Sequence, residues 1–200
     1  MEVKCIRERQ GYLRELQGKN KLVTVGVLGV QSGAGATTMA VSLAGYLSGF
    51  LKQKTAVVEC GQKSSFILMH NTEDVGHFSL KHIDYYCKGS LDMMSLGQLG
   101  YDMVVVDFGS GLSRIGDYMR CTHKIVVGTL EPWNVDRYEN FCQELREYNG
   151  SDSWLHILHG DIAELRRIRR AFGVCALKRP DIENVHIIDR SLIQFFQTLF

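Results

Sequence analysis

The stretch that decides the fold is LVTVGVLGVQSGAGATTMAVSLAGYLSGFL, residues 22–51. Its first part, Leu22–Val30, is a nearly continuous run of β-branched and leucine side chains, a pattern typical of a strand buried on both faces in a parallel sheet. A glycine-rich turn follows, and from Thr37 onwards the apolar residues recur at helical spacing. The stretch therefore predicts strand, loop and helix, the order in which a phosphate-binding loop is built.

The remainder of the chain alternates between expected strands and helices. Strands are expected at 54–60, 101–111, 123–132 and 154–160, and helices at 134–148, 161–173 and 191–200. Alternation at this spacing indicates right-handed βαβ crossovers, so we expect an α/β fold with a doubly wound, mostly parallel β-sheet flanked by helices. Residues 66–100 are expected to form helices and loops over one sheet edge. Residues 1–21 are expected to form an N-terminal helix or arm, and residues 22–200 a single domain.

Composition favours a protein without a strong electrostatic partner. The 200-residue chain carries 23 Lys and Arg against 22 Asp and Glu, a formal charge of +1, so no global field attracts nucleic acid or an acidic membrane. Its six cysteines show neither CxxC nor Cys/His ligand spacing, which indicates reduced, structural thiols. The sequence has no signal-peptide core and no apolar run near the ~20 residues of a membrane span, so we expect a cytoplasmic protein.

The glycine-rich turn is the candidate binding site. The residues expected to form it are Gln31, Ser32, Gly33, Ala34, Gly35, Ala36, Thr37 and Thr38. Glycines that adopt positive φ turn successive backbone N–H groups towards an anion at the start of a helix. In the usual motif a lysine adds a charge on the β- and γ-phosphates, and the next Thr or Ser reaches Mg²⁺. Here Ala36 stands where that lysine is normally found.

The segment QSGAGATT resembles the K-G-G-x-G-K-[ST]-[ST] loop of the deviant P-loop ATPases that include MinD and ParA. The positions that match are Gly33, Gly35, Thr37 and Thr38. Gln31 stands at the amino-terminal signature lysine, and Ala36 stands at the phosphate lysine. The resemblance therefore implies this family's fold with both of its loop lysines replaced.

Two further strand ends resemble the same family. YDMVVVDFGSG is similar to the family's Y-D-x-x-x-x-D-x-x-x-G, which implies that Asp107, together with Thr37, would hold Mg²⁺ if a nucleotide binds. AVVECGQ is similar to V-x-x-x-D-x-D-x-Q, with Glu59 at the first acid and Gly61 at the second. Since that second acid orients the attacking water in relatives, its replacement implies that the hydrolytic role is lost.

Alanine at the phosphate-lysine position also resembles the TadZ/CpaE branch, whose members are similar to ParA and position the assembly machinery of Tad-type pili. The resemblance implies a pseudo-ATPase for localisation or assembly of a bacterial surface machine, a Tad-type pilus or a secretion system. It would act as a homodimer and through protein partners, at the inner face of the membrane where those partners reach it. The expected cofactor is none, or weakly bound ATP or ADP with Mg²⁺, because each missing lysine removes ~1.5–3 kcal/mol.

Two other functions stay open: a nucleotide-binding slow ATPase that positions a cargo, and a DNA-segregation protein that uses RRIRR, residues 166–170. The balanced charge favours a solvated face or an acidic partner protein for these arginines, so we expect no nucleic acid. The seven histidines show no ligand spacing that predicts a metal site. We expect Trp133 to pack in the ordinary way rather than to cover a nucleotide base or a partner surface, and the last helix to pack on the sheet or on a dimer partner.

Overall fold

The computed structural model describes residues 22–62, 65–70, 76–90 and 93–199, so the predicted N-terminal helix or arm lies outside the described residues. The strands are β1 (Val23–Gly29), β2 (Thr55–Glu59), β3 (His77–Leu80), β4 (Ile83–Tyr86), β5 (Met103–Ser110), β6 (His123–Thr129), β7 (Leu155–His159) and β8 (Cys175–Lys178). The helices are α2 (Ala36–Gly49), α3 (Ser65–His70), α4 (Ile115–Arg120), α5 (Val135–Leu145), α6 (Ile162–Phe172) and α7 (Arg190–Gln197). These bounds confirm each strand and helix predicted within residues 22–62 and 101–199.

The described strands form one eight-stranded sheet in the order β3-β4-β2-β5-β1-β6-β7-β8. Neighbouring strands from β4 to β8 in this order run parallel, and only β3 runs antiparallel to its neighbour, β4. β1 therefore lies between β5 and β6, where the chain changes from building one half of the sheet to building the other. In open α/β sheets, ligands bind beyond the carboxyl ends of the strands at such a switch point. The glycine-rich loop after β1 lies at that place.

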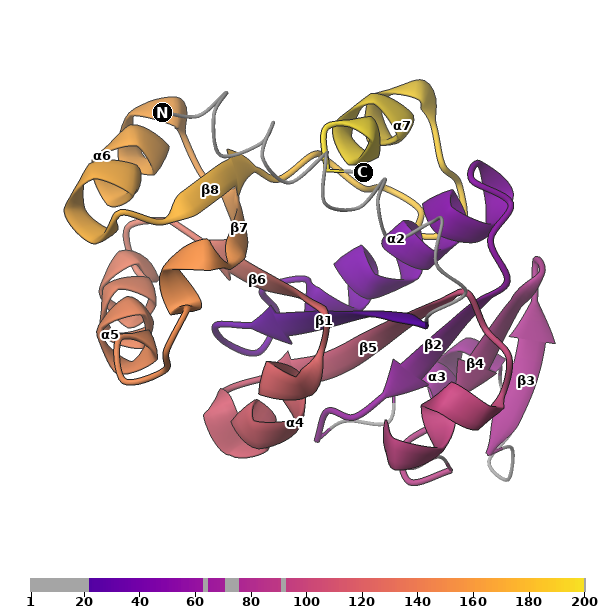
Figure 1. The fold of residues 1–200 in the computed structure, drawn as a ribbon. Helices are drawn as coiled ribbons and strands as arrows, with labels where there is room; N and C mark the ends of the chain where they lie inside the picture. The colour runs from indigo at the N-terminus through magenta and orange to yellow at the C-terminus, as the bar shows by residue number, and fades with distance from the viewer. Residues whose placement is uncertain (1–21, 63–64, 71–75, 91–92, 200) are drawn as a thin grey trace.

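Helices cover both faces of the sheet (Figure 1), as the predicted doubly wound fold requires. α2 and α7 lie over one face, where Leu192 and Phe196 of α7 join the core beneath α2. This contact confirms that the last helix packs within the chain. α4, α5 and α6 belong to the two clusters on the other face, which include Tyr118, Phe141 and Leu165.

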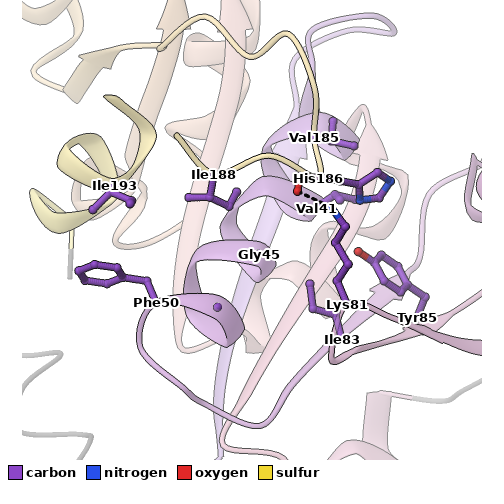
Figure 2. A pocket seen from close by; sticks show the side chains of 11 residues that line it. Val41, Gly45, Phe50, Lys81, Ile83, Tyr85, Val185, His186, Ile188 and Ile193 are labelled. Carbon is purple, nitrogen blue, oxygen red and sulfur yellow. Dashed lines mark hydrogen bonds between the residues drawn. The ribbon is translucent and has the colours of Figure 1, made fainter. Parts of the chain in front are cut away.

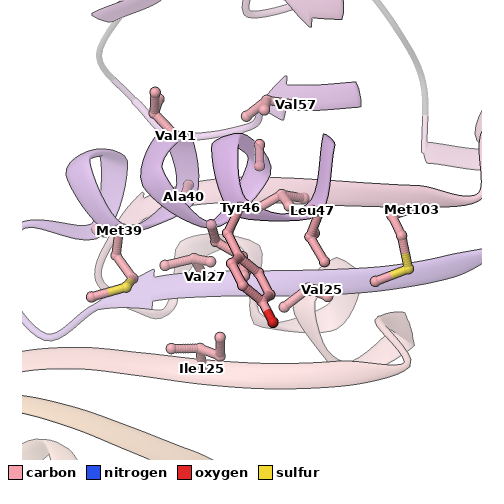
Figure 3. Close-up of a cluster of buried hydrophobic side chains, with 14 of the residues drawn as sticks. Val25, Val27, Met39, Ala40, Val41, Tyr46, Leu47, Val57, Met103 and Ile125 are labelled. Atoms are coloured by element: carbon pink, nitrogen blue, oxygen red, sulfur yellow. The ribbon is translucent and has the colours of Figure 1, made fainter. Parts of the chain in front are cut away.

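β1 is apolar apart from Thr24 because a core covers each of its two faces. Val25 and Val27 are fully buried on the α2 side, whereas Leu28 is buried on the opposite side. Figure 3 shows Tyr46 and Leu47 of α2 directed towards β1. A strand covered on both faces buries every second side chain in each of two cores. β1 can therefore serve as the rigid base of the loop that follows it.

The prediction for residues 66–100 was wrong in part. Besides α3 and a 3₁₀ helix at Met93–Gln98, this segment forms the β3–β4 hairpin, which extends the sheet at the edge of β2. Each hairpin strand is only four residues long. β8, which was also not predicted, has the same length. Runs this short are below the length at which periodicity identifies a strand. They form because the edge of an existing sheet supplies hydrogen-bonding partners.

Within the described residues, no helix is both long and apolar enough to cross a membrane. None of the five described cysteines takes part in a disulfide, and four of them are buried. This agrees with the predicted structural thiols at those five positions, while the sixth, Cys5, lies outside the described residues.

Candidate functional site

The loop between β1 and α2 has the backbone conformation of a phosphate cradle. Gly33 and Gly35 adopt left-handed φ values of 82° and 95°, which side chains other than glycine rarely adopt. Gly35 caps α2, a helix of 14 residues with no acidic residue in its first turn. The free N–H groups and the positive end of the helix dipole therefore face outwards, where an anion is stabilised.

A cleft of about 370 Å³ opens above this loop. Its lining includes all eight predicted loop residues, Gln31, Ser32, Gly33, Ala34, Gly35, Ala36, Thr37 and Thr38, together with Gly61, Gln62, Ser65, Asp107, Gly109 and Ser110. The structure thus brings the loop and the predicted magnesium residues into one place. That they bind a nucleotide and Mg²⁺ stays a prediction.

Asp107 is the ionisable group at the base of the cleft. The Thr37 hydroxyl donates to its Oδ2 at 2.5 Å, and the Gly109 N–H donates to its Oδ1 at 2.9 Å. The side chain is buried, and burial raises the pKa of this carboxyl above its ordinary value although both hydrogen bonds lower it. A carboxylate and a hydroxyl on adjacent elements are the hard oxygen ligands that suit Mg²⁺, so the donor set fits this ion.

At the two lysine positions of an ordinary phosphate loop, the cleft carries Gln31 and Ala36. Among its described lining residues none is lysine or arginine. Ala36, at the phosphate-lysine position, is 7% exposed and packs into the core beneath α2. Gln31 Oε1, at the signature position, is buried without a hydrogen-bond partner among the described residues. The cleft can therefore offer backbone N–H groups to an anion, but it offers no charge at these two positions.

Arg179, directly after β8, is a cation that contacts the loop and was missed as a site residue. Its Nη1 donates to the Ala34 carbonyl oxygen at 2.6 Å, across 145 residues of sequence. A Cβ added at Gly35 would lie 2.5 Å from the same nitrogen. Burial lowers the pKa of this guanidinium, and the charges of Asp181 and Glu131 raise it. The side chain therefore braces the loop at a carbonyl, whereas a loop lysine contacts phosphate.

The first of the two acid positions, at the end of β2, has a structural task. Glu59 is buried, with Oε1 accepting from the backbone N–H groups of Ser65 and Phe66, and Oε2 from that of Lys88. Burial raises the pKa of Glu59, and these backbone hydrogen bonds lower it. The Glu59 carboxylate thus anchors the start of α3 and the segment after β4. It does not line the cleft.

Gly61, where relatives carry the second acid, is in close contact with the turn after Asp107. A Cβ added there would lie 3.0 Å from the Gly109 Cα and backbone nitrogen, which is tighter than almost all real contacts. Both neighbouring atoms are backbone, so neither can move aside cheaply. The position is therefore shaped for glycine and does not simply lack an acid.

The arginines of RRIRR and the histidines were the other candidates for a binding site. In RRIRR, Arg167 pairs with Glu139 and Glu164 at 2.7 and 2.8 Å, and the Arg169 Nε donates to the Ala176 carbonyl at 2.8 Å. Two of the four arginines are thus engaged within the chain. His156 is buried against the Tyr138 hydroxyl at 2.7 Å. Among the described residues no group of three or more His, Cys, Asp and Glu side chains could hold a metal ion.

The prediction for Trp133 is wrong. It is 73% exposed and does not pack into the core. The residue follows the carboxyl end of β6, where the chain turns towards α5. Short turn segments at this end of the sheet have little core to pack against, and the sequence could not show that this tryptophan faces outwards.

Comparison with solved structures agrees with this geometry. The chain is similar to a ParA family ATPase from Chlorobium tepidum TLS, with 14% identity over 88% of this chain and 95% of that one, at a TM-score of 0.61. It is similar to a plasmid partition protein from Borrelia burgdorferi B31 bound to AMPPNP, with 15% identity over 90% and 96% of the two chains, at a TM-score of 0.61.

A third similar structure is the septum site-determining protein MinD from Pyrococcus horikoshii OT3 in complex with Mg-ADP, with 13% identity over 89% and 94% of the two chains and a TM-score of 0.64. No protein-family model matches the sequence, and no curated protein matches it significantly. Identities at this level establish a shared fold. The chain therefore has the P-loop fold of the ParA and MinD ATPases.

Proposed function

We propose that this chain is a ParA/MinD-like protein that positions or assembles other proteins without turning over ATP. The observation that carries the proposal is a cleft with the glycine geometry and the Thr37–Asp107 pair, but with no lysine or arginine among its described lining residues. Phosphoryl transfer depends almost entirely on positioning and on stabilisation of charge. Such a cleft can still hold a phosphate, but its described residues lack the groups that accelerate phosphoryl transfer.

The exposed apolar residues support action through protein partners. Among the exposed large apolar side chains, Leu68 is 81% exposed, Trp133 73% and Ile162 54%. Leu68 lies in α3, Trp133 in the turn before α5, and Ile162 at the start of α6. These segments follow the carboxyl ends of β2, β6 and β7. This is the sheet edge that carries the phosphate loop. Because three of the exposed apolar side chains lie at the edge that also carries the cleft, we assign homodimerisation or partner binding to this edge.

The resemblance of Ala36 to the TadZ/CpaE loop supports a bacterial surface machine as the setting, a Tad-type pilus or a secretion system. In this setting the chain would be recruited to the inner face of the membrane by its partners. A cofactor is not required for that role. Weakly bound ATP or ADP with Mg²⁺ would be compatible with it.

A second function is favoured by a specific observation. Since Thr37 and Asp107 fit Mg²⁺ and the loop keeps its conformation, a slow ATPase that positions a cargo is the alternative. The two functions differ in turnover, which a phosphate-release assay measures directly.

The experiment compares the purified full-length chain with Asp107→Ala and with Gln31→Lys/Ala36→Lys, measuring phosphate release and Mg-ATP binding by calorimetry. We expect no release above background from the wild type, and an affinity for Mg-ATP that rises ~10²-fold or more in the double lysine variant because two charge-assisted contacts are restored. Sustained release by the wild type that disappears in Asp107→Ala would contradict the proposal and establish the slow ATPase instead.

A further inference from the structure

A second cavity lies on the α2 side of the sheet, away from the phosphate loop (Figure 2). It has a volume of about 300 Å³ and is enclosed by α2, the β3–β4 hairpin and the segment that leads into α7. Its lining includes Gly45, Gly49, Lys81, Tyr85, His186 and Ile188, and most of the remaining wall is aliphatic. An apolar hollow with a few polar groups is the usual form of a small-molecule site.

Tyr85 places an unpaired hydroxyl at this cavity. The residue is fully buried, and its Oη has no hydrogen-bond partner among the described residues. The ring is fixed between Phe78, stacked at 4.9 Å, and Phe66, edge-on at 5.5 Å. Burial raises the pKa of this hydroxyl to about 12, so that it is a donor at neutral pH. A buried donor without an acceptor costs free energy, which a ligand acceptor would recover.

Lys81 supplies a cation to the same cavity from a strained turn. Lys81 and His82 join β3 to β4 with left-handed φ values of 51° and 63°, where a two-residue turn favours glycine or asparagine. The turn is held by the Ser48 hydroxyl, which donates to the His82 carbonyl at 3.0 Å. Lys81 Nζ donates to the His186 carbonyl at 3.0 Å, as Figure 2 shows, and has two further protons to donate. Strain maintained by surrounding contacts is typical of functional positions.

The charge of the cavity selects the sign of a ligand. His186 also lines it, and burial together with the Lys81 charge lowers the pKa of the imidazole, so the ring is neutral at pH 7. Lys81 is therefore the charged group among the described lining residues. An anionic group with two acceptor oxygens can accept from Lys81 and from Tyr85 together, whereas a cation would be repelled.

We propose that this cavity binds a small amphipathic carboxylate of the medium-chain fatty-acid class, with its alkyl group among the aliphatic walls and its carboxylate accepting hydrogen bonds from Lys81 and Tyr85. The small volume, at the lower end for ligand pockets, favours a short tail. None of these residues belongs to the phosphate loop. The proposal is therefore independent of the proposed function and extends beyond it.

Gly49, the last residue of α2, provides a direct way to fill the cavity. It lines the cavity, and a Cβ added at this position would meet no atom within 4 Å. Its φ is not in the left-handed region. A leucine at this position is therefore expected to fill the part of the cavity in which we place the alkyl group, without straining the backbone.

The test is a calorimetric titration of the full-length chain with octanoate, with octylamine as the probe of opposite charge. We expect saturable binding of octanoate and none of octylamine. Tyr85→Phe should weaken octanoate binding by about tenfold or more, because it removes one hydrogen bond to a charged group. It should leave Tm unchanged or slightly raised, because the deleted hydroxyl has no hydrogen-bond partner among the described residues of the free protein.

Gly49→Leu should abolish octanoate binding and leave the protein folded, and Gly116→Ala on α4 is the matched control that should bind as the wild type does. Lys81→Met should weaken binding while it keeps the aliphatic stem. The proposal is overturned if the wild type shows no saturable binding of octanoate, if octylamine binds equally well, or if Tyr85→Phe and Gly49→Leu bind octanoate with wild-type affinity.

Discussion

At the scale of single residues, the site keeps an acid where the fold disfavours its charge. Asp107 is buried, and burial outweighs the hydrogen bonds from Thr37 and Gly109, so that its pKa is raised. A carboxyl that lowers stability is retained most readily where it has a function, here the predicted contact with Mg²⁺.

Replacing Asp107 by Asn should therefore stabilise the protein. The amide keeps an acceptor for the Gly109 N–H, and the Thr37 hydroxyl can accept from the amide nitrogen. We expect a gain on the order of 1 kcal/mol at pH 7, or about 2–4 °C in Tm. Because the folded state binds this proton more tightly than the unfolded state, the gain is full above the raised pKa. It should shrink as the pH falls towards the ordinary value of 3.8.

Thermal melts of wild type and Asp107→Asn across this pH range measure the difference. Glu59→Gln is the matched control, because its new amide nitrogen would face the Lys88 N–H, which now donates to Oε2. We expect that change to destabilise the protein by about 1–3 kcal/mol. A destabilised Asp107→Asn would show that the charge itself supports the fold.

Gly61 gives a second prediction at the same scale. Any side chain there meets the Gly109 backbone at 3.0 Å, so Gly61→Ala should cost about 1–3 kcal/mol, as overpacking does. Gly61→Asp should cost at least as much and should not restore phosphate release. Gly116→Ala, in the open on α4, should instead stabilise by roughly 0.5–1 kcal/mol. Denaturant unfolding compares the three variants, and a Gly61→Asp protein of wild-type stability would refute the steric explanation.

At the scale of elements, the phosphate loop depends on a strand far away in sequence. Arg179 follows β8 and donates to the Ala34 carbonyl, so the outer edge of the sheet is connected to the start of α2. The sequence predicted the loop because glycines and a long apolar strand act locally. It could not predict the brace, because β8 is four residues long and the contact spans 145 residues.

The same difference between local features and long-range contacts explains which other elements were predicted and which were missed. β1, β5 and β6 were predicted because each is a long apolar run, which indicates a buried strand without reference to any other segment. The β3–β4 hairpin was missed, since its strands exist only through pairing with β2. Gly61 could be identified as a missing acid, but its contact with Gly109 belongs to the tertiary structure.

Arg179→Ala should loosen the loop and leave the sheet intact. Loss of one charge-assisted hydrogen bond is expected to cost ~1.5–3 kcal/mol. Hydrogen exchange followed by mass spectrometry should show faster exchange in the peptide that contains residues 31–38, while peptides from β1 and β5 stay protected. Arg166→Ala, an exposed arginine on α6, is the control and should leave exchange unchanged. Equal exchange in both variants would mean that the loop holds its shape without the brace.

At the scale of the whole molecule, the carboxyl edge of the sheet combines two properties. It carries the cleft and the exposed side chains of Leu68, Trp133 and Ile162. A partner that covers this edge would bury the apolar residues and shield the cleft together. Association then depends on apolar contacts, and it does not require a nucleotide to supply the charge that the loop lacks.

Trp133→Ala should therefore weaken self-association by at least tenfold, because a buried tryptophan at an interface contributes on the order of 2 kcal/mol or more. Sedimentation velocity over a concentration series measures the association constant, with and without millimolar Mg-ATP. We expect the wild-type constant to be the same under both conditions, since no lysine or arginine among the described lining residues couples the edge to phosphate. Ile187→Ser is the control, as it removes a 58% exposed apolar side chain from the segment before α7. Association that required Mg-ATP would show that nucleotide in the cleft controls it. Association that fell equally in both variants would show that the interface lies elsewhere.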